Sequence, residues 1–505
     1  MRVLQSSEMK EMDRFTIEEL DLPSRVLMER AGVSVVLALE HEMEDLYNKS
    51  FVVVVGKGNN GGDGLVVART LLDYSFDVNV VLLSKELKGN PKENFEVYTK
   101  MGGNYFVLGE DIDLAGFESL LMGADVVVDA ILGIGLKGDV REDVAEVIDM
   151  INMAPAYKVC VDISSGVDSD TGKVMGRAIR CDLTVTFAYP KVGHILYPGR
   201  EYTGKLKVAS IGIPKYLADR FNITRYITTA NFVREILPER PKDSHKGTFG
   251  KVAIVAGSKI YKGAAVLSAL GSLHSGVGLT YLLVPEEIHE IPAMVAPEVI
   301  TVPVPSCDGY FCEKSVDFVK DFLKKVDVFS IGPGLSQGKN IENFVKSVLK
   351  VERPAVVDAD ALNNVDITFF KERKAPTIIT PHPGEFARLL GKDTRDVIYN
   401  YKLAEEVAKE YGIVILLKGA TTIVTDGKET YFNITGDTGL AKGGSGDVLT
   451  GMIASFMAQG LSAKEAAIVS AYIHGRTTEY ADCQYSFSAT EVARNIGKVI
   501  RDYLK

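Results

Sequence analysis

The chain has 505 residues, and roughly 100–200 residues per domain predicts two or three domains and not a single core. Its composition, 46% hydrophobic and 25% charged residues, is that of an ordinary globular protein. A net charge of −10, with no run rich in lysine or arginine, excludes nucleic acid as the expected partner. A phosphate-bearing ligand must then be held by backbone dipoles and a few cations.

The sequence shows no pattern typical of export or membrane insertion. Its first residues lack the apolar core of a signal peptide, and no apolar run approaches the roughly 20 residues that span a bilayer. The cysteines are scattered and show no spacing typical of metal ligands. They are Cys160, Cys181, Cys307, Cys312 and Cys483. We therefore expect reduced thiols in a cytoplasmic protein that does not bind membranes.

The chain begins with a helical pattern and continues into a βα unit. Apolar residues at helical spacing extend over residues 9–48, with one break at Asp21-Leu22-Pro23. Residues 51–55, Phe followed by four Val, predict a buried strand of a parallel sheet. A glycine-rich turn over residues 56–64 follows, and residues 65–74 predict a helix. Strand, glycine turn and helix are typical of nucleotide-binding α/β folds.

The core of this turn, Asn59-Asn60-Gly61-Gly62-Asp63, is more specific than the GxGxxG pattern that overlaps it. It adds amide and carboxylate groups that a pyrophosphate-binding turn does not need. The alternative is a tight turn that serves only packing.

Six further strands are predicted in the N-terminal half, over residues 78–83, 105–108, 125–132, 158–163, 182–187 and 205–211. Ligands of open α/β sheets bind at the carboxyl ends of the strands. Two loops at such ends contain carboxylates, one from Asp129 to Asp139 and one from Asp162 to Asp168. Together with the Ser165 hydroxyl they suit either a hard cation or a hydroxylated substrate.

Four motifs in this half resemble the N-terminal NAD(P)H-hydrate epimerase domain: GKGNNGGDGLVVARTL, VDAILGIGLKGDV, VDISSGVDSDTG and TFAYPKVGHILYPG. The resemblance covers nearly all of residues 1–215 and implies a Rossmann-like domain. It implies that Asp162 lies near the altered nicotinamide ring, where it is our candidate acid–base group, with Asp129 or a bound water as alternatives. It also implies a potassium ion held by Asn60, Asp129 and Ser165. The chain has Ser164 where the family usually has proline, which leaves that turn less rigid. The implied substrate-binding residues are Asn59, Asn60, Gly61, Gly62, Asp63, Gly133, Ile134, Gly135, Leu136, Lys137, Gly138, Asp139 and Asp162.

A second α/β domain is predicted over residues 222–505, after a boundary segment at residues 215–222. Its first strand and glycine turn lie within residues 247–258, its first helix within 262–270 and its next strand within 279–284.

Later strands of this domain end in polar residues. Residues 326–331 lead to Gly332-Pro333-Gly334, residues 354–360 end in two carboxylates, and residues 377–380 lead to His382 between two prolines. A histidine in such a place favours a substrate contact over a structural role. Residues 413–417 and 423–425 predict a hairpin near a phosphate, with Lys418 between its strands.

The stretch Gly443-Gly444-Ser445-Gly446 precedes Asp447 and an apolar run. It predicts a glycine-rich turn that opens a helix, and the free N–H groups of such an end bind anions. Because an aspartate would repel a resting anion, Asp447 is our candidate base, which removes a proton from a hydroxyl about to meet a phosphoryl group. The alternative is that Asp447 is a simple N-cap.

The motifs GPGL, TPHPGEFARLL, LLKGATTIV and GLAKGGSGDVLTG resemble the ribokinase-like nucleotide-dependent NAD(P)H-hydrate dehydratase domain over roughly residues 225–505. The resemblance implies that Gly334, His382 and Asp447 bind the hydrate. It implies ADP, and not ATP, as the phosphoryl donor, with Mg²⁺, and AMP and phosphate as products. The implied nucleotide-binding residues are Lys418, Gly419, Ala420, Thr421, Thr422, Gly443, Gly444, Ser445 and Gly446.

Together the two resemblances imply a bifunctional repair enzyme built from two three-layer α/β/α domains, and we expect a homo-oligomer. The first domain is expected to interconvert the R- and S-forms of hydrated NADH and NADPH (NADHX and NADPHX), and the second to dehydrate the S-form. One alternative is a small-molecule kinase with a nucleotide-sensing N-terminal domain. Another is an N-terminal scaffold without chemistry, against which its loop carboxylates argue.

Overall fold

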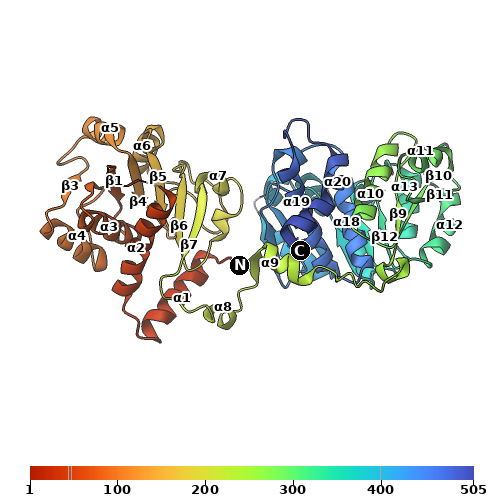
Figure 1. Cartoon of the computed structure of the whole chain (residues 1–505), viewed down its shortest axis with the longest axis horizontal. Helices are drawn as coiled ribbons and strands as arrows, with labels where there is room; N and C mark the ends of the chain where they lie inside the picture. Colours follow the sequence, from red (N-terminus) through yellow and green to blue (C-terminus); the bar gives the residue numbers. More distant parts are fainter. Residues whose placement is uncertain (44, 47, 399, 505) are drawn as a thin grey trace. The chain divides into compact units, whose positions relative to one another are not determined.

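The computed structural model describes residues 1–504 except 44, 47 and 399. It divides into two compact units, Arg2–Ile223 and a second unit that begins at Thr224 and includes Met1 (Figure 1). Each unit has its own sheet with helices, so the predicted fold class of two α/β domains is confirmed. None of the helices in the described part of the chain combines the length and apolar character that a membrane span requires.

The sheet of the N-terminal unit has seven strands, all parallel, in the order β3-β2-β1-β4-β5-β6-β7. This is the Rossmann-like order with one strand added. The order reverses between β1 and β4, and ligands of such sheets bind at this point. The strands are β1 (Ser50–Val55), β2 (Asp77–Leu82), β3 (Asn104–Val107), β4 (Val126–Ala130), β5 (Tyr157–Val161), β6 (Leu183–Phe187) and β7 (Lys205–Ala209).

Helices cover both faces of this sheet, because alternate residues of the strands point to opposite sides. Val53 and Val55 pack in one core cluster with residues of α1 to α4, whereas Val52 and Val54 pack in another with residues of α5 and α6. The helices are α1 (Ser6–Glu18), α2 (Ser24–Glu42), α3 (Asn59–Asp73), α4 (Asn90–Lys100), α5 (Leu114–Gly123), α6 (Glu142–Met153), α7 (Gly199–Thr203) and α8 (Leu217–Arg220).

The glycine turn predicted over residues 56–64 is shorter than expected, because α3 begins at Asn59. Close packing of α3 on the end of β1 requires Gly61, since a Cβ there would lie 1.9 Å from the carbonyl oxygen of Gly56. This packing places the first turn of α3 at the carboxyl edge of the sheet.

The expectation of reduced thiols is wrong for four of the five cysteines. Cys160 in β5 and Cys181 before β6 form one disulfide, and Cys307 and Cys312 form another, with Cα–Cα distances of 6.0 and 6.1 Å. These distances are normal for disulfides. Spacing along the chain concealed the first pair, because 21 residues separate cysteines that neighbouring strands bring together. Asp129 lies within 4.8 Å of both sulfurs, but sulfurs bonded to each other are not thiolate ligands.

The sheet of the C-terminal unit has ten strands in the order β11-β10-β9-β12-β13-β14-β15-β16-β17-β8. Neighbours are parallel except that β16 is antiparallel to both β15 and β17, so the predicted hairpin is confirmed. The strands are β8 (Arg225–Ile227), β9 (Lys251–Val255), β10 (Leu279–Pro285), β11 (Ile300–Val304), β12 (Val328–Ile331), β13 (Ala355–Val357), β14 (Thr377–Ile379), β15 (Val414–Leu417), β16 (Thr422–Thr425) and β17 (Thr430–Asn433).

One helix, α18 (Ser445–Ala458), lies deep in this unit and contacts α10, β9, β12 and β13. A Cβ on Gly451 of α18 would lie 1.9 Å from the carbonyl oxygen of Ser268 on α10, so the two helices cross in close contact. The position of the N-terminus of α18 is therefore fixed by packing. The other helices are α9 (Ala230–Ile236), α10 (Lys262–His274), α11 (Glu290–Val295), α12 (Glu313–Leu323), α13 (Lys339–Val348), α14 (Ala359–Asn363), α15 (Pro383–Leu390), α16 (Thr394–Ile398), α17 (Tyr401–Tyr411), α19 (Ala463–Arg476) and α20 (Ala489–Val499).

Candidate active sites

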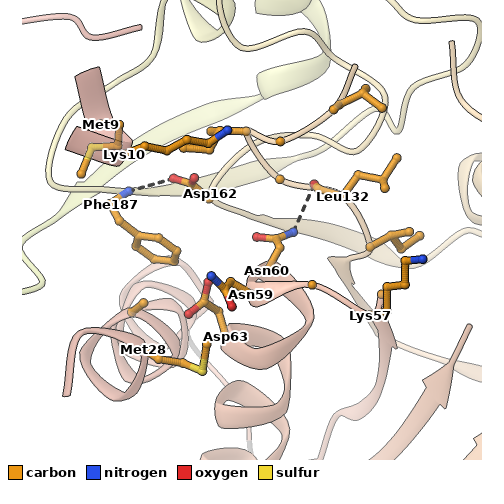
Figure 2. Close-up of a pocket in the computed structure, with 18 of the residues that line it drawn as sticks. Met9, Lys10, Met28, Lys57, Asn59, Asn60, Asp63, Leu132, Asp162 and Phe187 are labelled. Carbon is orange, nitrogen blue, oxygen red and sulfur yellow. Dashed lines mark hydrogen bonds between the residues drawn. The ribbon is translucent and has the colours of Figure 1, made fainter. Parts of the chain in front are cut away.

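A cavity of about 790 Å³ opens at the carboxyl ends of β1, β4 and β5 in the N-terminal unit (Figure 2). This is the edge at which the strand order reverses, where a ligand is expected. Gly62 does not line the cavity, and a Cβ on it would lie 2.6 Å from Cε of Met28 on α2. The predicted substrate-binding residues that line the cavity are Asn59, Asn60, Asp63, Gly133, Ile134, Gly135, Leu136, Lys137, Asp139 and Asp162.

Asp162 follows β5 with a positive φ of 64° and is held by three donors. The hydroxyl of Thr186 (2.9 Å), the N–H of Phe187 (3.2 Å) and the ammonium of Lys191 (2.5 Å) all donate to its Oδ1. Burial favours the neutral acid, but the charge and hydrogen bond of Lys191 hold the pKa of Asp162 below its ordinary value. Asp162 is therefore a fixed, ionised carboxylate at the cavity wall.

His194 supports this ion pair as a neutral ring. Its Nδ1 accepts a hydrogen bond from the backbone N–H of Lys191 (3.0 Å), so Nε2 carries the proton and donates to the carbonyl oxygen of Asp162 (2.9 Å). Burial and the positive charge of Lys191 lower the pKa of His194 to about 3. The histidine thus orients the backbone of Asp162 without competing for its charge.

Two more carboxylates line the same cavity, Asp63 on α3 and Asp13 on α1. Burial, with the negative charges of Asp162 and Asp13, raises the pKa of Asp63 well above its ordinary value. Burial raises the pKa of Asp13 to about 6, against the attraction of Lys191. Asp13 belongs to none of the motifs quoted above, and Lys191, the lysine of TFAYPKVGHILYPG, was given no role there. The signal for Asp13 was its position four residues after Met9, on the apolar face of α1.

The three residues predicted to hold potassium come together around Leu132. Ser165 donates to the Asp129 carboxylate from its N–H (2.8 Å) and its hydroxyl (2.6 Å), and its oxygen accepts from the N–H of Leu132 (2.8 Å). The side-chain amide of Asn60 donates to the carbonyl oxygen of Leu132 (3.1 Å). Burial raises the pKa of Asp129 to about 6, against the hydrogen bonds from Ser165. A buried carboxylate among oxygen donors fits a hard cation.

Ser164, which stands where proline is usual in the resembled family, is fully buried. Its hydroxyl donates to the carbonyl oxygen of Ile179. A hydrogen bond therefore holds the turn at Ser164, and its lower rigidity stays a prediction.

In the C-terminal unit, Asp447 is the third residue of α18 and not its N-cap. The N-cap is Gly444, which has a φ of +93°, and a Cβ there would also lie 2.4 Å from Cδ1 of Leu267. The alternative of Asp447 as an N-cap is therefore wrong. Ser445, in the same turn, lies with its hydroxyl 3.0 Å from Nε2 of the buried His474 on α19.

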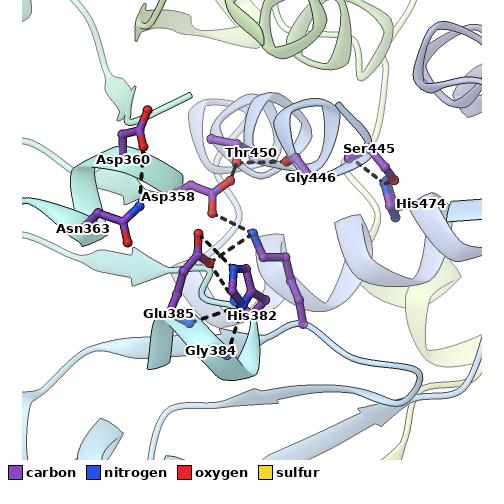
Figure 3. A network of polar contacts seen from close by, with 11 residues as sticks. Asp358, Asp360, Asn363, His382, Gly384, Glu385, Ser445, Gly446, Thr450 and His474 are labelled. Atoms are coloured by element: carbon purple, nitrogen blue, oxygen red, sulfur yellow. Dashed lines mark hydrogen bonds and ion pairs between the residues drawn. The ribbon is translucent and has the colours of Figure 1, made fainter. Parts of the chain in front are cut away.

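A buried ion pair lies next to this helix end (Figure 3). The ammonium of Lys418, just after β15, donates to Asp358 Oδ1 (2.8 Å), and the hydroxyl of Thr450 donates to Oδ2 (2.6 Å). Burial opposes the charge of Asp358, but Lys418 and these hydrogen bonds hold its pKa below the ordinary value. A Cβ on Gly446 would lie 3.5 Å from the ammonium nitrogen. A cation thus stands beside the N–H groups of the first turn of α18, as a phosphate site requires.

Asp447 lies in this environment, and none of the described lysines or arginines forms an ion pair with it. Burial and the negative charge of Asp358 raise the pKa of Asp447 to about 7, against the attraction of Lys418. A carboxyl with a pKa near neutrality suits a general base, because a large fraction of it is ionised at working pH and that ionised form binds a proton more strongly than an ordinary carboxylate does.

His382 is the N-cap of α15. Its Nδ1 accepts from the N–H groups of Gly384 (3.1 Å) and Glu385 (3.2 Å), and the Glu385 carboxylate accepts from the N–H of His382 (2.8 Å). The HPGE motif is therefore a capping box with an imidazole in place of the usual hydroxyl. The ring is half exposed, so a substrate contact stays a prediction beside this structural role.

The other predicted residues of this unit lie in neighbouring loops. Gly419 and Ala420 are exposed in the turn between β15 and β16, whereas Thr421 is buried. Gly334 has a φ of +66° and packs against Tyr261, since a Cβ on it would lie 2.7 Å from that of Tyr261. The sheet topology therefore brings the GPG, HPGE, KGATT and GGSGD segments to one edge.

Comparisons with known proteins decide the family. A family model described as NAD(P)H-hydrate dehydratase matches residues 252–500, and one described as YjeF-related protein N-terminus matches residues 24–193. The bifunctional NAD(P)H-hydrate repair enzyme Nnr of Moorella thermoacetica is 42% identical over 94% of this chain and 91% of its own length. The chain belongs to the family of bifunctional NAD(P)H-hydrate repair enzymes. The Nnr enzyme of Pyrobaculum aerophilum is 34% identical over 100% of this chain and 99% of its own.

Among solved structures, the ADP/ATP-dependent NAD(P)H-hydrate dehydratase from Bacillus subtilis, co-crystallized with ATP/Mg²⁺, is 32% identical to this member of the family. The similarity covers 55% of this chain and 98% of that chain, with a TM-score of 0.49.

Two substitutions of His382 distinguish its helix-capping role from a contact with the substrate. Asparagine also caps helices well, whereas alanine does not, so His382→Ala is expected to lose about 1 kcal/mol of unfolding free energy and His382→Asn much less. If the imidazole contacts the hydrate, both variants lose dehydratase kcat/KM. Denaturant unfolding and steady-state kinetics check this, and wild-type kcat/KM in the Asn variant would contradict the substrate contact.

The raised pKa of Asp447 predicts a pH-dependent gain of stability in Asp447→Asn. The folded carboxyl titrates near 7 and the unfolded one near 3.9, so the wild-type protein loses stability as pH rises between these values. The Asn variant escapes this loss. Its melting temperature is expected to exceed the wild-type value at pH 8, with the difference vanishing toward pH 4. The exposed Asp482→Asn variant is the control, and an equal difference at both pH values would refute the shifted pKa.

Proposed function

We propose that the N-terminal unit interconverts the R- and S-forms of NAD(P)H hydrate, and that the C-terminal unit dehydrates the S-form with ADP, giving AMP and phosphate. Membership in the repair-enzyme family supports both activities. The observation that carries the dehydratase half is the Asp447 carboxyl, which has a pKa of about 7 and lies in the first turn of α18, next to the Lys418 ammonium.

Dehydration begins at a hydroxyl on the ring carbon next to the ring nitrogen. Hydroxide is a poor leaving group, so the hydroxyl must first be phosphorylated. Asp447 takes the hydroxyl proton while the oxygen attacks the terminal phosphate of the donor. The N–H groups of α18 and the ammonium of Lys418 stabilise the negative charge of the transferring group. The lone pair of the ring nitrogen then expels phosphate, which leaves a carbon–nitrogen double bond, and loss of a proton from the neighbouring ring carbon to solvent restores NADH or NADPH.

The hydrate and the adenine nucleotide are both proposed to bind to loops at the carboxyl edge of the C-terminal sheet. Gly334 and His382 contact the hydrate, and residues 418–422 and 443–446 contact the adenine nucleotide. Mg²⁺ bound with the donor supplies positive charge to its phosphates. Nucleotide dependence is supported by the comparisons. Within it, we propose that the donor is ADP.

In the N-terminal unit, residues 59–63 and 133–139 cradle the hydrated nucleotide, with Asp162 near the altered ring. Asn60, Asp129 and Ser165 would hold potassium, whose charge compensates the buried Asp129 carboxylate. Asp162 takes part in epimerisation as an ionised carboxylate, because Lys191 stabilises that form.

The proposal includes a homo-oligomer that works in the cytoplasm on NADHX, NADPHX and adenine nucleotides, without nucleic acid or membrane partners. The net charge of −10 supports the exclusion of nucleic acid. An exposed Leu37 on α2 beside a groove of about 290 Å³ is compatible with a subunit contact, and light scattering on the purified chain measures the oligomeric state.

Repair is tested directly by incubating hydrated NADH or NADPH with ADP or ATP and following the absorbance of the restored reduced ring. Recovery with ADP is expected, and Asp447→Ala is expected to lower kcat by ~10²–10⁴, the usual contribution of a general base. The Kd for ADP should stay nearly unchanged, measured by calorimetry.

The exposed Asp482→Ala variant controls for loss of a negative charge. A stable phosphorylated product without restored NADH would identify a small-molecule kinase instead. Near-normal turnover by Asp447→Ala would remove the role of Asp447 while leaving the dehydratase activity in place.

Potassium is expected to raise the melting temperature of the wild-type protein relative to choline chloride at equal ionic strength. A ligand at ~100 times its Kd stabilises the folded state by about 2.7 kcal/mol. Asp129→Asn should abolish this increment. Asp125→Asn, at the opposite end of β4, should retain it even if the absolute melting temperature falls, because Asp125 binds Ser50 far from the proposed ligands. A potassium increment in Asp129→Asn would refute the site.

A further inference from the structure

The N-terminal cavity contains a carboxylate, Asp13, that the proposed chemistry does not use. Asp13 lies beside the buried Met12 on the inward face of α1. Among the described residues no side chain or backbone N–H donates a hydrogen bond to it, whereas Glu11 and Glu18 of the same helix both pair with Arg14. Its carboxylate is therefore available to a ligand in the cavity.

The position of Asp13 is fixed relative to the buried ion pair. The segment before α1 pairs with the segment that carries Lys191: Leu4 donates to the carbonyl oxygen of Pro190 (3.0 Å) and accepts from the N–H of Val192 (3.1 Å). The helix bearing Asp13 is thus anchored to the chain that supplies the ammonium for Asp162.

The two carboxyls take up protons in different pH ranges. Burial raises the pKa of Asp13 to about 6, with Lys191 opposing and Asp162 adding to the shift, whereas Asp162 is ionised. Two carboxyls in one site whose surroundings separate their pKa values are typical of an acid and a charge-stabilising partner. The other titratable or charged groups around this part of the cavity are Lys10 on α1, Asp63 on α3, Lys191 and, behind Asp162, His194.

We propose that Asp13 is the proton donor of the epimerisation. The inference rests on the proposed function of the N-terminal unit. Asp13 transfers its proton to the hydroxyl of the hydrate, the carbon–oxygen bond breaks, and water leaves while the lone pair of the ring nitrogen forms a carbon–nitrogen double bond. Asp162 stabilises the cationic ring. Water adds to the opposite face, the electron pair returns to nitrogen, and the released proton passes to Asp162 and through solvent back to Asp13. Nothing is oxidised or reduced.

The test uses the full chain, the pure R-form of the hydrate and ¹⁸O-labelled water. Chromatography measures inversion, and mass spectrometry measures ¹⁸O in the hydroxyl. Asp13→Asn is expected to lower both rates by ~10²–10⁴ after subtraction of the uncatalysed rate, and Asp13→Glu to recover part of the loss. Glu18→Gln, on the exposed side of the same helix, should match the wild type. Wild-type kcat/KM should fall as pH rises above about 6, and this limb should be absent in Asp13→Asn.

Folding of the Asn variant is checked by its dehydratase rate on the S-form and by its binding of NADP⁺. A folded Asp13→Asn protein with the wild-type rate and pH profile would overturn the role of Asp13 but leave the epimerase function intact. A wild-type protein that does not invert the R-form would refute the proposed function itself. If the Asn variant does not fold, the ¹⁸O measurement on the wild-type protein tests the proposal. Inversion without ¹⁸O uptake would rule out loss of the hydroxyl and, with it, the role of Asp13 as proton donor.

Discussion

Each unit of the chain holds a buried lysine–aspartate ion pair at the carboxyl edge of its sheet, Lys191 with Asp162 (2.5 Å) and Lys418 with Asp358 (2.8 Å). Burying two charges is costly unless further hydrogen bonds complete the pair, and in both units a threonine hydroxyl donates to the aspartate. Because the lysine charge is largely neutralised by one aspartate, the next carboxylate lies in a net negative, dehydrated environment. Its pKa rises, which makes it the group that exchanges protons.

Close helix packing places these groups where a ligand can reach them. α3 and α18 begin at the edge of their sheets, and a glycine in each allows backbone contacts that a Cβ would prevent, at Gly61 against Gly56 and at Gly451 against Ser268. The first turns of both helices therefore present N–H groups at fixed positions. Donors that are already in position lose little conformational entropy when an anion binds. The packing of the core therefore favours anion binding by fixing these N–H groups in advance.

Local sequence patterns predicted the scaffold well because they depend on short-range physics. The Val-rich run at residues 51–55 became β1, and the hairpin around Lys418 formed as predicted. The partners that tune the carboxyls were not visible, because they come from distant segments. Lys191 reaches Asp162 from 29 residues away, and Asp13 faces the cavity only because its helix docks beside that lysine. The capping role of His382 was hidden for another reason, since imidazole is an uncommon N-cap.

The two raised pKa values act in opposite directions on the proposed chemistry. Asp447 works as a base and is competent when ionised, above about 7, whereas Asp13 works as an acid and is competent when protonated, below about 6. Near neutral pH each carboxyl is present partly in the required form. Because the dehydratase is proposed to consume only the S-form, a rise in pH speeds its step while slowing the supply from the R-form. Clearance of the R-form is then governed by the N-terminal cavity, where burial of Asp13, opposed by the charge of Lys191 and reinforced by that of Asp162, determines how readily Asp13 keeps its proton.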